Sequence, residues 1–222
     1  MNTPLKGTIG WRSILDYPHH PSGAMIAAAL AGGQGKRFGG EKCLAPIHGR
    51  PMAAWALEAA AAVAESVVII ANKPELYSGF GWPVRPDLIP GMGPLSGLYT
   101  AFEVTGAQEL FLLACDMPMA DPAAIRYIIQ RASASSAEAV IPFCSGREQG
   151  LFAVYRRRAL NRYMNDILTA SIQFNQFRLG LEKTIITQQE LEEAGVKMDT
   201  FMNVNTVEEL RSAEKKAPRG QL

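Results

Sequence analysis

The sequence predicts a single α/β domain with three layers, in which helices cover both faces of a mostly parallel, Rossmann-like sheet. Two observations lead to this fold class. Several short apolar segments follow one another along the chain, and segments with helical start and stop signals separate them. No linker divides the chain between about residue 24 and residue 215, so one domain is expected there. A chain of 222 residues is long enough to bury a core without disulfide bonds or metals.

The strand predictions rest on short apolar runs, several of them rich in β-branched residues. The run Val-Val-Ile-Ile at 67–70 shows no alternation between apolar and polar residues. Such a run predicts a strand that is covered on both faces, as in a parallel sheet between helices. Strands are expected at 25–30, 66–72, 109–116, 138–143, 150–155 and 183–188.

The helix predictions rest on residues that favour helix ends. Pro51 opens a helix, because proline is favoured in a first turn. Gly106 ends another, and Asp121 caps a third that runs to about residue 133. Thr206 caps the last one. Helices are expected at 51–65, 94–106, 122–133, 157–180, 189–195 and 207–216.

The two ends of the chain differ in character from the predicted domain. Residues 1–23 contain prolines and glycines without an apolar period, which predicts a disordered extension or a start upstream of the natural one at Met25. The alternative is that Trp11 and Ile14 pack against the domain or a partner. Residues 216–222 are expected to form a flexible tail, which leaves 24–215 as the folded domain.

Composition excludes several classes of protein. The net charge of +1 argues against a broadly basic nucleic-acid binder. Three scattered cysteines and three histidines lack metal-ligand spacing, which favours free thiols in a reducing compartment. The longest apolar run, 52–64, is interrupted by Glu58 and is too short to cross a bilayer. A soluble, cytoplasmic protein without a membrane or nucleic-acid partner is therefore expected.

A glycine-rich loop follows the first predicted strand. Residues 30–52 contain six glycines and four residues that are lysine or arginine. Backbone N–H groups of such a loop can surround an anion, and Lys36, Arg37 and Lys42 add positive charge. The loop therefore predicts a phosphate site, whereas the alternative is a solvated loop with ordinary surface charges.

Two well-known phosphate loops do not match. The P-loop pattern G-x-x-x-x-G-K-[ST] is absent. A dinucleotide fingerprint should open directly into a helix and be followed by an acidic residue at the end of the second strand. Here prolines hold the loop open, and the second strand ends in Asn72. A dehydrogenase is therefore disfavoured.

Two carboxylates stand where predicted strands or loops end. Asp116 follows a wholly apolar strand, and a carboxylate in that place can hold a divalent cation beside a phosphate. The alternative is a turn or helix-capping aspartate. Asp87 lies in a glycine- and proline-rich loop before the helix at 94–106. It can accept hydrogen bonds from a base or a ribose, unless that loop is a plain turn.

These residues together resemble the signature of the molybdenum cofactor guanylyltransferase family. The loop LAGGQGKRFGGEKCLAPIHGRPM carries most of the likeness. Three further stretches follow in the family's order: PDLIPGMGPLSGL, ACDMP and FMNVNTVEEL. The resemblance extends from about residue 25 to residue 212 and implies a sheet of the nucleotidyltransferase type.

The resemblance implies a role for each matching residue. Arg37, Lys42 and Asp116 would carry catalysis, with Asp116 also holding Mg²⁺. The nucleotide would contact Leu30, Ala31, Gly32, Gly33, Lys42, Asp87 and Asp116, with Asp87 on the guanosine portion. The pterin side would include Arg37, Gly97, Asn203 and Asn205. The implied reaction is transfer of GMP from GTP to the phosphate of molybdopterin, and contact with molybdopterin-inserting or acceptor proteins is compatible with it.

Departures from the signature leave alternatives open. Glu41 stands where the signature has an aspartate. Ile70 stands where some members have an asparagine, and Asn72 could take over that contact. Gln149-Gly150 stands where many members have a pair resembling His-Pro. CTP-dependent transfer, transfer to a sugar phosphate, and a non-catalytic nucleotide-binding carrier therefore stay as alternatives. The run 156–158 of three arginines is interpreted as a solvated face, or as a site for an acidic partner.

Overall fold

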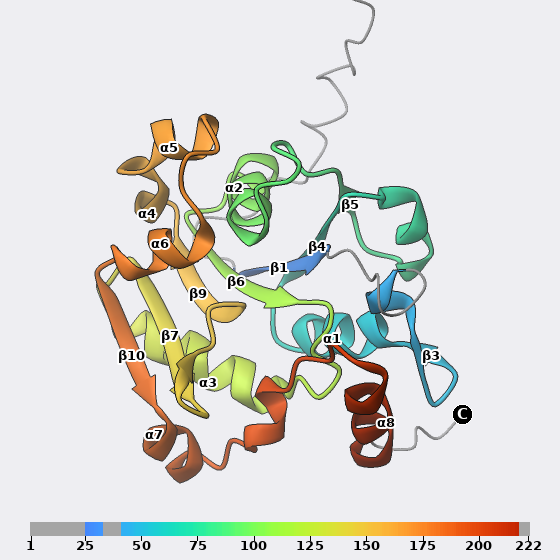
Figure 1. Ribbon diagram of the computed structural model, residues 1–222. Helices are drawn as coiled ribbons and strands as arrows, with labels where there is room; N and C mark the ends of the chain where they lie inside the picture. The colour runs from blue at the N-terminus through green and yellow to red at the C-terminus, as the bar shows by residue number, and fades with distance from the viewer. Residues whose placement is uncertain (1–24, 33–40, 218–222) are drawn as a thin grey trace, which may run out of the picture.

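The computed structural model describes residues 25–32 and 41–217. The expected extension at 1–23 lies outside these residues, as do Gly33 and Arg37 of the glycine loop. Within the described part, one large sheet runs through the molecule with helices on both faces (Figure 1). The predicted α/β fold class is thereby confirmed.

The large sheet has eight strands among the described residues, in the order β10-β7-β9-β6-β1-β4-β5, with β8 paired to β7. A separate hairpin is formed by β2 and β3. The strands are β1 (Ile26–Ala31), β2 (Pro46–Ile47), β3 (Arg50–Pro51), β4 (Ser66–Ala71), β5 (Val84–Arg85), β6 (Glu109–Ala114), β7 (Ala139–Cys144), β8 (Arg147–Glu148), β9 (Phe152–Arg156) and β10 (Lys183–Thr187).

The centre of the sheet is parallel. Strand β1 lies between β4 and β6 and is parallel to both, with Leu30 opposite Ile70 and Ala114. The carboxyl ends of these three strands therefore meet at one edge. Strand β9 is antiparallel to both β6 and β7, so the sheet is mixed on that side. The prediction of a mostly parallel sheet holds for its central strands.

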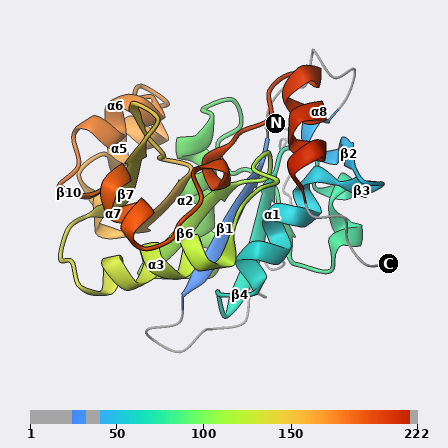
Figure 2. The same ribbon diagram turned by 90° about the horizontal axis from the view of Figure 1, so that it is seen from below.

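Two helical layers cover the sheet (Figures 1 and 2). One layer contains α1 (Met52–Ala61), α3 (Pro122–Ser133) and α7 (Gln188–Glu193). The other contains α2 (Pro94–Thr105), α4 (Arg158–Asn161), α5 (Met164–Leu168) and α6 (Phe174–Leu179). Helix α8 (Val207–Lys216) packs beside the β2–β3 hairpin. Short 3₁₀ turns are η2 (Lys42–Leu44), η3 (Pro74–Leu76), η4 (Ser78–Phe80) and η5 (Met198–Phe201).

The predicted helix ends are largely confirmed. The Asp121 side chain accepts a hydrogen bond from the Ala123 amide at the start of α3. Thr206 caps α8, and Gly106 ends α2 in the left-handed conformation, with φ of 67°. Helix α1 begins at Met52, one residue later than expected, because Pro51 pairs in the hairpin instead. Helix α8 continues to Lys216, and Ala217 after it is buried.

The prediction of one helical stretch at 157–180 is wrong. Three short helices occupy it, and the break after α5 has a local cause. The Thr169 side chain donates a hydrogen bond to the Asn165 carbonyl, and Ala170 adopts a left-handed φ of 52°. A non-glycine residue in that conformation interrupts a right-handed helix.

The interpretation of the three arginines as a solvated face is also wrong for Arg156 and Arg157, whereas Arg158 is exposed. Arg156 pairs with Glu109 at 2.7 Å and donates to the carbonyls of Ala132 and Ala137. Arg157 pairs with Glu103 at 2.8 Å and donates to the carbonyls of Phe102 and Ala107. Arg158 donates to the Ser136 carbonyl. The side chains of Arg156 and Arg157 thus join the end of β9 and the residue after it to the ends of α3 and α2.

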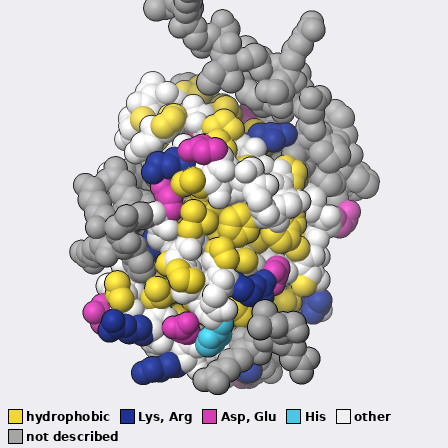
Figure 3. Space-filling view, turned by 90° about the vertical axis from the view of Figure 1, so that its right-hand side faces the viewer, with side chains coloured by type: hydrophobic (Ala, Val, Ile, Leu, Met, Phe, Trp, Pro, Cys, Tyr) yellow, Lys and Arg dark blue, Asp and Glu magenta, His cyan; other side chains and the backbone are white. Residues whose placement is uncertain are grey.

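The described surface has no broad field of one charge on the face shown in Figure 3, where acidic and basic side chains are interspersed around an apolar area. Within the described residues, no helix is both long and apolar enough to span a bilayer.

Candidate active site

The site forms where the three parallel central strands end. Gly32 follows β1, Asn72 follows β4, and Asp116 follows β6 after one intervening cysteine. The Cys115 amide donates to the Leu30 carbonyl at 3.0 Å, which continues the pairing of β1 and β6 up to Asp116. The parallel register therefore brings loops that are far apart in sequence to one edge, where α/β proteins bind ligands.

An ion pair marks this edge. The Lys42 Nζ atom lies 2.5 Å from Asp116 Oδ2 and donates to Asn205 Oδ1 at 2.9 Å. The Val204 amide donates to the Asp116 backbone carbonyl at 2.9 Å, which holds the segment around Asn205 against the end of β6. The side chains of Lys42 and Asp116 are 13% and 16% exposed. Three sequence segments thus meet at one partly buried lysine.

Asp116 can offer one oxygen to a cation. Its Oδ1 atom is buried and has no hydrogen-bond partner among the described residues. No group of three acidic, histidine or cysteine side chains suitable for a metal occurs in 25–32 or 41–217. A metal site here would therefore take most of its ligands from phosphates and water, as Mg²⁺ commonly does. Glu41, which replaces the signature's aspartate, pairs with Lys73 at 2.8 Å.

The two thiols beside the ion pair are neutral. Burial, together with the negative charge of Asp116, raises the pKa of the Cys43 thiol to about 12. Burial also raises the pKa of Cys115 well above its usual value. A thiol in this state is a poor nucleophile, because the thiolate is the reactive form. Cys43 and Cys115 therefore serve packing.

A cavity of about 410 Å³ opens at the ends of β1 and β4. Six predicted site residues line it together: Leu30, Ala31, Gly32, Asp87, Gly97 and Asp116. Ile70 and Asn72 line it as well. The structure thus brings together five of the residues expected on the nucleotide side, and it places Gly97 among them. Lys42 does not line this cavity, and Gly33 lies outside the described residues.

Asp87 is fixed by neighbours from α2. Its Oδ1 atom accepts hydrogen bonds from the Ile89 amide at 3.2 Å, the Thr100 hydroxyl at 3.1 Å and the Ser96 hydroxyl. All three bonds use the same oxygen, so the carboxylate is oriented by a polar cluster at the start of α2. The bond from Ile89 is an Asx turn within the loop, and the bonds from Ser96 and Thr100 tie that turn to α2.

Gly97 allows β1 and α2 to approach closely. A Cβ atom at this position would lie 2.7 Å from Leu30 Cδ2, which is well inside van der Waals contact. The glycine therefore lets the Leu30 side chain lie between the end of the strand and the first turn of the helix. Its role in the fold is to set the shape of the smaller cavity.

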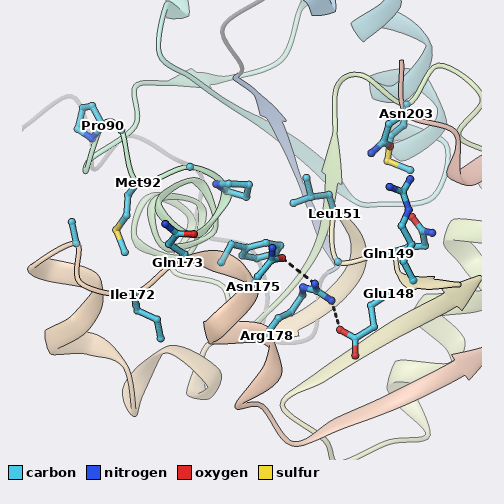
Figure 4. Close-up of a pocket in the computed structure, with 18 residues that line it drawn as sticks. Pro90, Met92, Glu148, Gln149, Leu151, Ile172, Gln173, Asn175, Arg178 and Asn203 are labelled. Atoms are coloured by element: carbon cyan, nitrogen blue, oxygen red, sulfur yellow. Dashed lines mark hydrogen bonds and ion pairs between the residues drawn. The ribbon is translucent and has the colours of Figure 1, made fainter. Parts of the chain in front are cut away.

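A second cavity of about 860 Å³ adjoins the first (Figure 4). The two cavities share Gly91, Gly93, Pro94 and Leu151 as lining residues. The larger one is further lined by the turn at 147–150, by the segment 170–178 and by Asn203. The Asn203 Oδ1 atom is buried without a hydrogen-bond partner among the described residues.

The predicted pterin-side residues are thus spread over the site. Asn203 lines the larger cavity, Gly97 the smaller one, and Asn205 contacts Lys42. Sequence reasoning missed the residues from 147–150 and 170–178 on the larger cavity's wall. The pair Gln149-Gly150 between two predicted strands was the available signal, because a departure from the signature stood there.

A lysine paired with an aspartate at the carboxyl edge of a parallel sheet, between two adjoining cavities, is the arrangement of an enzyme that brings a nucleotide and an acceptor together. The fold and site therefore define the class of nucleotidyltransferases. Residues 27–172 match the family described as the MobA-like NTP transferase domain, and the chain belongs to that family.

Named relatives agree with this assignment. The chain is 32% identical over 192 residues to a probable molybdenum cofactor guanylyltransferase of Thermococcus kodakarensis, covering 84% of this chain and 92% of the relative. It is 29% identical over 200 residues to the molybdenum cofactor guanylyltransferase of Desulfosudis oleivorans, covering 90% and 98%. The predicted family and enzyme class are confirmed.

Solved structures share the fold. The molybdopterin-guanine dinucleotide biosynthesis protein A of Archaeoglobus fulgidus superposes with a TM-score of 0.75 at 23% identity, covering 86% of this chain and 97% of that one. A CMP:2-keto-3-deoxy-manno-octonic acid synthetase complexed with CTP superposes with a TM-score of 0.64 at 15% identity, covering 88% and 98%. The sheet is therefore of the nucleotidyltransferase type.

Proposed function

We propose that this chain transfers GMP from GTP to the phosphate of molybdopterin and releases pyrophosphate. The observation that carries the proposal is the Lys42–Asp116 pair at the junction of two cavities, in a chain whose relatives are named guanylyltransferases. Asp116 lines the smaller cavity, and Met117 directly after it lines the larger one. A reacting phosphate at this point can meet partners from both sides.

For this reaction the protein must align the two substrates and neutralise the negative charge of their phosphates. An oxygen of the acceptor's phosphate bonds to the α-phosphorus of GTP, and the bond from that phosphorus to the bridging oxygen of the β-phosphate breaks. The attacking phosphate is already ionised, so no general base is needed. Lys42 supplies positive charge to the phosphates, and we expect Arg37 of the glycine loop to add to it.

Asp116 is the residue that would hold Mg²⁺, through the oxygen that lacks a partner among the described residues. When bound, the ion neutralises phosphate oxygens as negative charge shifts to the leaving pyrophosphate. We expect Lys42 to leave Asp116 Oδ2 for a phosphate when the nucleotide binds. Asp116 then keeps its charge close to the reacting groups.

The two cavities divide the substrates. Leu30, Ala31 and Gly32 with Asp87 would hold the nucleoside in the smaller cavity. The larger cavity would hold the pterin, where Asn203 Oδ1 can accept a hydrogen bond from a ring N–H group. The free thiols of the described residues suit a reducing compartment, and we expect the enzyme to act in the cytoplasm.

A turnover assay tests the proposal. The purified chain is incubated with Mg²⁺, metal-free molybdopterin and either GTP or CTP, and pyrophosphate and the dinucleotide product are measured. We expect both products with GTP and far less with CTP. Faster turnover with CTP, or with a sugar phosphate as acceptor, would favour another transferase. Binding of GTP without any pyrophosphate would favour the carrier alternative.

A further inference from the structure

One wall of the larger cavity carries an excess of positive charge. The Glu148 carboxylate forms ion pairs with two cations. One is the Arg178 guanidinium, and the other is Lys183, whose Nζ atom lies 2.6 Å from Glu148 Oε1. Arg147 lines the same cavity. Glu148 is the only acidic side chain among the described residues that line it. Two cations share one carboxylate here, so this wall favours an electron-rich ligand.

Arg178 lies along this wall in a fixed position (Figure 4). Its Nη1 atom donates to Glu148 and its Nη2 atom to Asn175 Oδ1 at 3.1 Å. The guanidinium carbon lies 5.8 Å from the centre of the Phe174 ring. The side chain is 14% exposed. A guanidinium has five N–H donors and no acceptor, so groups remain that can only bind an acceptor atom of a ligand.

Gly150 makes room for this arginine. A Cβ atom at Gly150 would lie 2.5 Å from Arg178 Cδ and 2.8 Å from its Nε atom. The clash would fall on the middle of the side chain, which cannot move without moving the guanidinium. The backbone of Gly150 is not in the left-handed region. The absence of a side chain at this position therefore serves the placement of Arg178.

We propose that Arg178 is a specificity-determining residue for the acceptor, and that Gly150 and Glu148 position it. This inference rests on the proposed function. Arg178 donates hydrogen bonds to an acceptor-rich edge of the pterin, such as carbonyl, ring-nitrogen or thiolate atoms, away from the reacting phosphate. It lines only the larger cavity, while the residues shared with the smaller cavity lie elsewhere on its lining. Binding of the nucleotide is accordingly independent of it.

The test compares Arg178→Gln, Arg178→Lys and Gly150→Ala in the full chain. We expect Arg178→Gln and Gly150→Ala each to raise KM for molybdopterin about tenfold, the size expected for losing a hydrogen bond to a charged group. Arg178→Lys should lie between wild type and Arg178→Gln. The kcat value and the thermal shift caused by GTP should stay close to wild type, which a merely structural defect would not produce.

A double variant tests whether Gly150 acts by positioning the charge of Arg178. Gly150→Ala combined with Arg178→Gln should raise KM no more than the stronger single change, because both remove the same contact. Gly79→Ala, where a new Cβ meets open space, is the matched glycine control. Arg131→Gln, which breaks a pair with Glu190, is the matched arginine control. Both controls should leave KM unchanged.

The outcomes distinguish this inference from the proposed function. If wild type makes the dinucleotide and Arg178→Gln shows an unchanged KM, Arg178 does not select the acceptor. If the double variant raises KM by the product of the two single effects, Gly150 does not act by positioning Arg178. If wild type makes no dinucleotide, calorimetric titration with metal-free molybdopterin replaces KM, and weaker binding to Arg178→Gln would still support the inference. Should Arg178→Gln not fold, Arg178→Lys and Gly150→Ala decide by the same readouts.

Discussion

The two ends of the active-site cleft handle charge in different ways. At the smaller cavity, one lysine meets one aspartate, and one oxygen of that aspartate has no partner among the described residues. At the far wall of the larger cavity, Arg178 and Lys183 share the single carboxylate of Glu148. The first arrangement can exchange partners during a reaction, whereas the second holds a cation in place. Under the proposed function, we expect the first end to carry the chemistry and the second to recognise the acceptor.

The elements behind the two ends also differ. Parallel strands β1, β4 and β6 set the positions around Asp116 through their common register. The far wall is assembled from the β8–β9 turn, α6 and β10, which touch mainly through side chains. Variation at the far wall can therefore change the acceptor without disturbing the reaction.

Asp116→Asn should give the largest effect and tests the first end of this comparison. The change removes a charge while keeping the size of the side chain. We expect turnover to fall at least about a hundredfold, the scale for losing one preorganised electrostatic group. Pyrophosphate release at saturating Mg²⁺ and GTP measures it. A rate near wild type would show that the unpaired oxygen of Asp116 holds no catalytic metal.

Lys42→Met should give the second-largest effect. Methionine keeps much of the side chain's length but has no charge, so phosphates in the smaller cavity lose a cation. We expect turnover to fall about tenfold to a hundredfold and the thermal shift caused by GTP to shrink. The melting temperature without ligand should change much less than the GTP-induced thermal shift. A large loss of stability would instead make Lys42 a structural residue.

Gly97→Ala tests whether the shape of the smaller cavity matters separately from its charge. The new Cβ would press on Leu30 and move it toward the nucleotide side. We expect the Kd for GTP to rise about fivefold, or about 1 kcal/mol. Stability should hold, since alanine is favoured over glycine in a helix by about 1 kcal/mol. Adding Leu30→Ala should restore part of the affinity, and an unchanged Kd in the single variant would show that Leu30 yields freely.

Glu190→Gln should give the smallest effect and serves as a reference outside both cavities. Hydrogen bonds from Thr187 and then from Arg131 lower the pKa of Glu190 to about 2 from its ordinary 4.5. A carboxylate with a lowered pKa stabilises the fold above pH 4.5, and this contribution is lost as pH falls toward 2. We expect the free energy of unfolding to drop by about 0.5–1 kcal/mol at pH 7, with no change in turnover.

Denaturant titrations at pH 7 and pH 2.5 check this reference. The difference between Glu190→Gln and wild type should shrink at the lower pH. An equal difference at both pH values would mean that the charge of Glu190 is not the cause.

The sequence predicted the end of the site that depends on the backbone. Leu30, Asp87 and Asp116 come together because strand ends and glycine loops are visible as local patterns. The far wall could not be predicted, because nothing local in the sequence places Arg178 across Gly150 or Lys183 against Glu148. Those contacts depend on how short helices pack, and the break at Ala170 decides that packing.

The fold prediction also failed at 157–180 and at the three arginines. Helical composition at 157–180 was real, but the left-handed backbone of Ala170 interrupts the helix after α5. A run of like charges usually lies in solvent, yet Arg156 found a carboxylate and carbonyl groups from distant segments. Partners far apart in sequence decided the case of the arginines, whereas the helix break at Ala170 is local.

The arrangement of Arg156 and Arg157 has a consequence for how the molecule unfolds. Arg156 is the last residue of β9, and Arg157 directly after it has a helical backbone at the start of α4. Arg156 reaches the last turn of α3 on one face, and Arg157 reaches the last turn of α2 on the other. Two consecutive residues, one at the end of β9 and one just after it, therefore anchor both layers of helices at once. Loss of either layer would break contacts of the same two residues. We therefore expect the two layers to unfold as one cooperative unit.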